Sequence, residues 1–106
     1  MNKPKLLSTL GLVQKAASVT SGEDLSLMAI RSSRAKLVFL ASDAGPSTTK
    51  RITDKTTFYK IPLLTILTGD ELSHAIGKSG RRVLAITDAK LAALLINTAN
   101  ETEKEV

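Results

Sequence analysis

The sequence contains no cysteine, no tryptophan, few other aromatic residues and no long apolar run. Without cysteine, the 106-residue chain cannot form a disulfide, use a thiolate nucleophile or bind zinc through cysteine. Its only aromatic residues are Phe39, Phe58 and Tyr59, so we expect a core of aliphatic side chains, which suits helices packed on a sheet. No stretch approaches the roughly 18 apolar residues that would suggest a membrane-spanning helix.

The N-terminal segment lacks the pattern of a secretory signal peptide. Lys3 and Lys5 provide positive charge, but Thr9 and Lys15 interrupt the apolar residues that follow. We therefore expect a soluble, cytoplasmic protein without a membrane as its partner.

Charge is unevenly distributed along the chain. The formal net charge is +5, but segment 101–106 has three glutamates against one lysine. The rest of the chain therefore carries +7, which attracts polyanions such as nucleic acids and raises encounter rates with them. Because stacking platforms are missing, this composition favours recognition of folded RNA by shape and backbone over binding of single strands.

Apolar spacing predicts helices that alternate with strands in one domain. Helices are expected at 5–17, from Ser21, at 48–59, at 70–76 and after Asp88. Strands are expected at 18–20, 36–41, 63–67 and 83–86. Such alternation predicts a mainly parallel sheet with helices on both faces, with strand 36–41 at its centre. We expect residues 1–96 to form the domain and residues 97–106 a mobile polar tail.

The same spacing predicts which helical side chains are buried. Ser21 should cap the second helix with its hydroxyl. The inward-facing residues are expected to be Leu25, Met28 and Ala29 in the second helix and Leu91, Leu94 and Leu95 in the last.

Few residues suggest catalysis. Gly77-Lys78-Ser79 resembles the end of a phosphate-binding P-loop, but Leu72 stands where the first glycine should be, and the segment follows a helix rather than a strand. His74 is the only histidine, and a lone histidine without cysteine makes no strong transition-metal site. We expect no enzyme, catalytic residue, cofactor, metal or small-molecule substrate; a phosphate site at Gly77–Ser79 is the only basis for the enzymatic alternative.

Two segments are candidates for nucleic-acid contact. At Gly22-Glu23-Asp24, a glycine at a helix start allows close approach of another backbone, and exposed amides can hold a phosphate. The turn 77–82 supplies three cations, and Arg31 adds charge. The predicted topology places both segments at one edge of the sheet, where cations would bind phosphates and Glu23 would accept hydrogen bonds from base amines. An ordinary helix cap and a solvated basic loop are the alternative interpretation.

Several motifs together resemble the kink-turn-binding ribosomal-protein superfamily, of the L-seven-Ae and L-thirty-e type, and its short bacterial members. They are Leu-Gly-Leu-Val-Gln-Lys-Ala (10–16), Ser-Gly-Glu-Asp (21–24), Ala-Ile-Arg-Ser-Ser-Arg-Ala-Lys-Leu-Val (29–38), Ala-Ser-Asp-Ala (41–44) and Asp-Glu-Leu-Ser-His-Ala-Ile-Gly (70–77). The resemblance implies an α/β fold, a three-layer α/β/α sandwich with a four-stranded mixed sheet. It also implies a monomer that binds structured RNA, kink-turn-like or ribosomal, as a ribosome-associated or ribonucleoprotein component.

The resemblance also assigns RNA-binding residues. The family motif Gly-X-Asn-Glu-X-X-Lys places its glycine on Gly22, but its polar positions hold Asp24, Leu25 and Met28. These replacements leave open a protein-interaction module that keeps the fold without specific RNA recognition. The predicted RNA-binding residues are Gly22, Glu23, Asp24, Met28, Arg31, Gly77, Lys78, Arg81 and Arg82.

Overall fold

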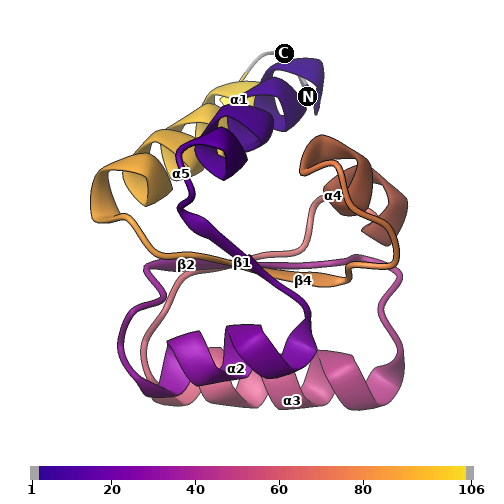
Figure 1. Ribbon diagram of the computed structural model, residues 1–106, viewed down its shortest axis with the longest axis vertical. Helices are drawn as coiled ribbons and strands as arrows, with labels where there is room; N and C mark the ends of the chain where they lie inside the picture. The colour runs from indigo at the N-terminus through magenta and orange to yellow at the C-terminus, as the bar shows by residue number, and fades with distance from the viewer. Residues whose placement is uncertain (1–2, 105–106) are drawn as a thin grey trace.

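The computed structural model describes residues 3–104, in which helices and strands alternate. The helices are α1 (Lys3–Lys15), α2 (Glu23–Arg31), α3 (Pro46–Phe58), α4 (Gly69–Ala75) and α5 (Ala89–Lys104). The strands are β1 (Val19–Ser21), β2 (Leu37–Leu40), β3 (Leu63–Leu64) and β4 (Val83–Ile86). Helices α1, α4 and α5 cover one face of the sheet, and α2 and α3 cover the other (Figure 1). The predicted α/β/α sandwich is confirmed.

The sheet is mixed, with the strand order β1-β4-β2-β3. Strand β4 is antiparallel to both β1 and β2, and only β2 and β3 are parallel. The prediction of a mainly parallel sheet is therefore wrong, whereas the mixed sheet implied by the family resemblance is confirmed. Continuous apolar runs predict burial on both faces but do not specify the direction of the neighbouring strand.

Alternate side chains of β2 and β4 enter two apolar clusters, one on each face of the sheet. The cluster beneath α1, α4 and α5 includes Leu37, Phe39, Leu84 and Ile86. The cluster that packs on α2 and α3 includes Val38, Leu40, Val83 and Ala85. Every residue of both strands is buried, so these two strands hold the layers together, as expected for the central segment 36–41.

Helix α2 differs from its prediction in its start and its buried face. Ser21 ends β1, and Gly22 occupies the N-cap position without a side-chain hydrogen bond. Leu25 and Met28, expected inside, are 56% and 57% exposed. The buried face instead includes Ser26, whose hydroxyl donates to the carbonyl oxygen of Thr20. This hydrogen bond lets a polar residue replace an apolar one on the inner face.

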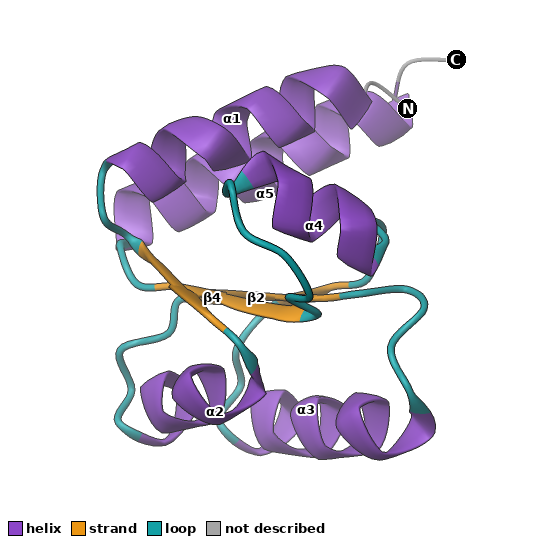
Figure 2. Cartoon of the chain, turned by 45° about the vertical axis from the view of Figure 1, so that its right-hand side comes forward, coloured by secondary structure: helices purple, strands orange, loops and turns teal. Residues whose placement is uncertain are grey.

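Helix α5 continues beyond its predicted end, so the tail expected from residue 97 is helical as far as the structure describes it. Thr98 and Ala99 are buried, and α5 lies alongside α1 (Figure 2). The Thr98 hydroxyl donates to the carbonyl oxygen of Leu94, which satisfies its polar group inside the layer. Leu94, expected inside, is 48% exposed. Residues 105–106 of the predicted tail lie outside the described residues.

Candidate functional site

Loops from several strands meet at one end of the sheet. The Gly22 amide donates to the carbonyl oxygen of Val83 at 2.9 Å, which joins the end of β1 to the start of β4. The Ala41 amide donates to the Arg82 carbonyl oxygen at 2.8 Å, which joins the end of β2 to the same point. We call residues 22–24, 41–45 and 77–82 the Gly22 end. The two segments predicted from the sequence to share an edge of the sheet therefore do so.

Gly22 has a backbone conformation that only glycine adopts readily. Its φ is 100° and its ψ is 155°, a region that is essentially closed to residues with a side chain. No atom lies within 4 Å of the position that its Cβ would occupy, its chain neighbours aside. Gly22 therefore turns the chain from β1 into α2 and leaves open space in front of the first turn, whose amides lack helical partners.

Glu23 makes contacts with α3 that were not predicted from the sequence. One carboxylate oxygen accepts a hydrogen bond from the Thr48 hydroxyl at 2.6 Å, and the other pairs with the Arg51 guanidinium. Both partners belong to α3, so Glu23 fixes the start of α2 against α3. Each carboxylate oxygen of Glu23 therefore already has one partner within the chain. Thr48 and Arg51 were missed because no local pattern links them to a residue so distant in the chain.

The other predicted residues of α2 separate along the helix. Asp24 is exposed in the first turn, and Met28 is exposed in the second half of the helix. Arg31 is the last residue of this nine-residue helix, so it lies about 13–14 Å along the axis from Gly22. The structure therefore does not bring Arg31 together with the basic turn at residues 77–82.

The basic turn is held in place by Ser73 of α4. The Ser73 hydroxyl donates to the Arg81 carbonyl oxygen at 3.0 Å and accepts from the Arg81 amide at 2.8 Å. Gly77, with a φ of 68°, ends the helical segment. Lys78 and Arg82 are exposed, whereas Arg81 is half-buried and its Nε has no hydrogen-bond partner among the described residues.

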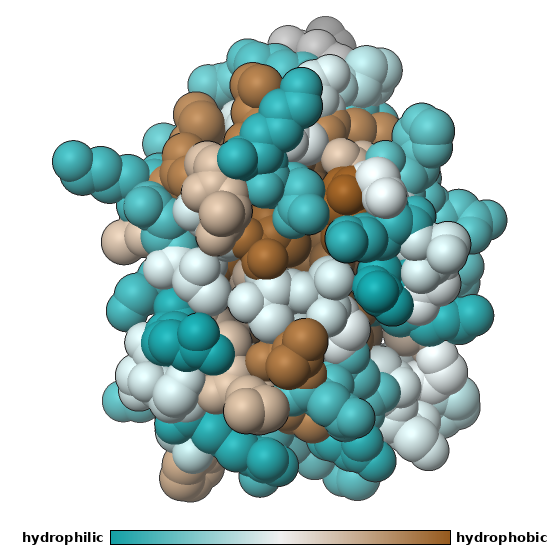
Figure 3. All heavy atoms as spheres, viewed as in Figure 1, coloured by the Kyte–Doolittle hydropathy of each residue, from teal (hydrophilic) through white to brown (hydrophobic). Residues whose placement is uncertain are grey.

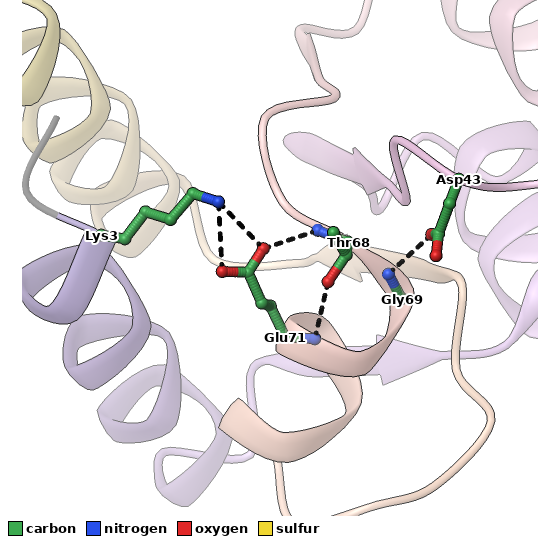
Figure 4. Close-up of polar contacts among 5 residues, drawn as sticks. All are labelled: Lys3, Asp43, Thr68, Gly69 and Glu71. Carbon is green, nitrogen blue, oxygen red and sulfur yellow. Dashed lines mark hydrogen bonds and ion pairs between the residues drawn. The ribbon is translucent and has the colours of Figure 1, made fainter.

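Helix α4 is anchored by polar contacts that the sequence analysis did not assign (Figure 4). Thr68 and Glu71 form a capping box, and the Lys3 ammonium lies 3.2 Å from a Glu71 carboxylate oxygen. The Thr68 amide donates to this carboxylate and, with Lys3, lowers the pKa of Glu71 despite partial desolvation. The Asp43 carboxylate accepts from the Gly69 amide at 2.9 Å. These contacts fix α4, and with it Ser73, beside the Gly22 end.

The concave features near this end are small or open. Asp43, Ser73 and Arg81 line a cavity of about 40 Å³, too small for a nucleobase. A larger apolar groove lies between α1 and α4, where brown side chains gather in Figure 3. Leu12, which is 64% exposed, His74 and Gly77 line this groove. Any ligand of the Gly22 end must therefore bind across a surface rather than inside a pocket.

Metal binding and membrane insertion are two other classes of function. Among the side chains of residues 3–101, no three His, Asp or Glu are grouped so that they could hold a metal ion. No helix in this part of the chain has the length and apolar character needed to cross a membrane.

Comparisons with known proteins point to one family. The sequence model of the ribosomal protein L7Ae/L30e/S12e/Gadd45 family matches residues 4–96. The RNA-binding protein YlxQ of Bacillus subtilis strain 168 is 46% identical over 88 residues, which cover 83% of this chain and 88% of that protein. The RNA-binding protein YlxQ of Enterococcus faecium is 36% identical over 87 residues, which cover 82% and 84%.

Solved structures share the fold. A protein of unknown function from Bacillus halodurans C superimposes with a TM-score of 0.86 at 35% identity, over 91% of this chain and 97% of that one. The Giardia lamblia 15.5kD RNA binding protein superimposes with a TM-score of 0.78 at 18% identity, over 92% and 87%. The second likeness concerns the fold alone.

Proposed function

The chain belongs to the ribosomal protein L7Ae/L30e/S12e/Gadd45 family, and from this premise we propose that it binds structured RNA through its Gly22 end. The observation that supports the site is the pair of backbone hydrogen bonds from Gly22 to Val83 and from Ala41 to Arg82. They place a glycine helix start and a basic turn beside each other. The RNA-binding protein YlxQ, at 46% identity, supports the class of ligand.

The chemistry of this surface suits an RNA backbone. Lys78 and Arg82 are exposed on the turn and would contact phosphates, whereas the first amides of α2 would donate to a phosphate brought close by Gly22. Arg81 has a buried Nε donor without a partner in the described part of the chain, and a small shift of the turn would offer it an RNA oxygen. Glu23 holds α2 in position through Thr48 and Arg51.

The finer proposal is recognition of a kink-turn-like or ribosomal RNA by a cytoplasmic monomer in a ribonucleoprotein. A kink-turn presents a sharply bent backbone, which fits an open surface flanked by two loops better than a straight duplex does. Asp24, in the first turn of α2, and Met28, further along the same helix, are both exposed and would then face the RNA, with Met28 offering an apolar contact rather than a charge.

Affinity measurements with three RNAs test this proposal. A kink-turn RNA, its unkinked mutant and a plain duplex are titrated at two salt concentrations with the parent protein and with Lys78→Glu/Arg82→Glu. We expect tightest binding to the kink-turn, weaker binding at high salt, and loss of affinity for all three RNAs in the variant. Lys90→Glu, at an exposed position on α5, is the control and should bind as the parent does.

The results distinguish kink-turn recognition from general RNA binding and test the location of the site. Equal, salt-sensitive binding to all three RNAs would reject kink-turn recognition and leave a general RNA-binding protein. Unchanged affinity in Lys78→Glu/Arg82→Glu would reject the Gly22 end as the site.

A protein-interaction module is the second candidate function, because apolar side chains are exposed beside the Gly22 end. Leu25 and Met28 project from α2, and Leu12 lines the groove between α1 and α4. Exposed apolar side chains of this kind mark protein contacts when they gather in one area. Absence of binding to all three RNAs would favour this function.

A further inference from the structure

The opposite end of the sheet has its own basic and aromatic surface. Loops 32–36 and 59–62 connect α2 to β2 and α3 to β3 there, and we call them, with Phe58, the Lys36 end. They surround an open cavity of about 260 Å³ whose lining includes Ile30, Lys36, Tyr59 and Lys60. The proposed function uses none of these residues. Arg31, at the end of α2, lies nearby.

Two of the three aromatic rings of the chain are exposed together at this end. Phe58 is 76% exposed and Tyr59 is 37% exposed. Their ring centroids lie 5.0 Å apart with an interplanar angle of 75°, so the edge of one ring supports the face of the other. Phe39, in contrast, is buried in the core. We expected no aromatic stacking platform from the sequence, which did not show that two of the few aromatic rings are exposed together.

The charge around these rings is positive. Lys36 and Lys60 line the cavity, and no acidic residue does. The Lys36 ammonium donates to the Ser33 carbonyl oxygen at 3.1 Å, which holds it at the cavity and leaves two further donors. On α3, Asp54 is paired with Lys50. A ligand that suits this surface therefore combines flat apolar faces with negative charge.

We propose that the Lys36 end is a second RNA-contact surface, which binds an unpaired segment of RNA. A base stacks on the face of Phe58, the more exposed ring, with Tyr59 beside it, while Lys36 and Lys60 contact the phosphates on either side. Unpaired nucleotides expose the faces of their bases, which stack on aromatic rings with little dependence on sequence. A duplex hides those faces, so this surface complements the Gly22 end and does not depend on its proposed function.

The chain provides a local probe for this site. Tyr59 is the only tyrosine and tryptophan is absent, so intrinsic fluorescence excited in the near ultraviolet reports on the Lys36 end. We expect a fluorescently labelled oligouridylate of about 8 nucleotides, within the range of single-strand site sizes, to bind saturably. The unlabelled oligouridylate should quench the Tyr59 emission over the same concentration range, whereas a blunt RNA duplex should not.

Two variants test the residues. Lys36→Glu/Lys60→Glu and the uncharged change Phe58→Ala should each weaken oligouridylate binding by about tenfold or more. Lys15→Glu/Lys90→Glu, which makes the same change in charge on α1 and α5 over the other face of the sheet, should retain it. All three alter exposed side chains, and a thermal-unfolding curve shows that each variant is folded.

Each other outcome overturns the inference. The surface is rejected if the oligouridylate does not bind, if it binds without quenching Tyr59, or if Lys15→Glu/Lys90→Glu weakens binding as much as Lys36→Glu/Lys60→Glu does. Kink-turn binding that fails while oligouridylate binding follows the expected pattern would reject the proposed function and leave this inference in place.

Discussion

Replacement of Gly22 by alanine tests how the chain enters α2. With φ at 100° and ψ at 155°, an alanine would be forced into a region that costs about 1–3 kcal/mol. No clash adds to this cost, because nothing lies within 4 Å of the new Cβ beyond its chain neighbours. For a domain of about 100 residues, that loss lowers the Tm by about 4–20 °C.

Gly45→Ala is the matched control. Gly45 also has open space around its Cβ position, but its φ of −65° and ψ of 162° are allowed for alanine. Loss of the preferred N-cap residue destabilises the fold, whereas the lower entropy of the unfolded chain stabilises it. The free energy of unfolding should therefore change by no more than about 0.5 kcal/mol. Thermal and urea unfolding followed by circular dichroism measures both variants. Equal stability of Gly22→Ala and Gly45→Ala would refute the backbone argument.

Three further predictions concern the capping box and the basic turn. Thr68→Ala should lower the free energy of unfolding by about 1 kcal/mol in urea titrations, because the first turn of α4 loses its side-chain cap; an unchanged midpoint would contradict this role. The pKa of Glu71 is lowered in the folded state. Ionised Glu71 therefore stabilises the folded state above its unfolded-state pKa, and this stabilisation is lost as pH falls through its folded-state pKa. The Tm difference between Glu71→Gln and the parent should therefore be largest near neutral pH and shrink in acid, and a pH-independent difference would show that the charge is not involved. Lys78→Gln/Arg82→Gln should reduce the slope of log affinity for structured RNA against log salt by about 2, as for two lost phosphate contacts; an unchanged slope would mean that neither residue contacts phosphate.

Local patterns in the sequence predicted the helices and strands better than they predicted which helix faces are buried or where the elements begin and end. The apolar runs at 36–41 and 83–86 correspond to β2 and β4, because strands covered on both sides must be apolar throughout. In α2, apolar spacing allowed two faces. The burial of Ser26 decided between them, and it depends on the Thr20 carbonyl oxygen in another element.

The candidate site was predictable only in part for the same reason. Gly22 and the turn 77–82 were identified from residue type and order, and the backbone places them together. The partners of Glu23 and the support that Ser73 gives to Arg81 depend on tertiary contacts. Arg31 was grouped with the wrong surface because spacing along a sequence does not show which end of the sheet a helix end reaches.

Mapping the bound RNA on the protein shows directly whether RNA binds at the Gly22 end. A kink-turn RNA without unpaired extensions is titrated into ¹⁵N-labelled protein, and the change in chemical shift of each backbone amide is followed. We expect the largest changes in chemical shift at residues 22–24 and 77–82 and only small changes at residues 32–36 and 59–62. Largest changes at residues 32–36 and 59–62, or no changes at all, would contradict it.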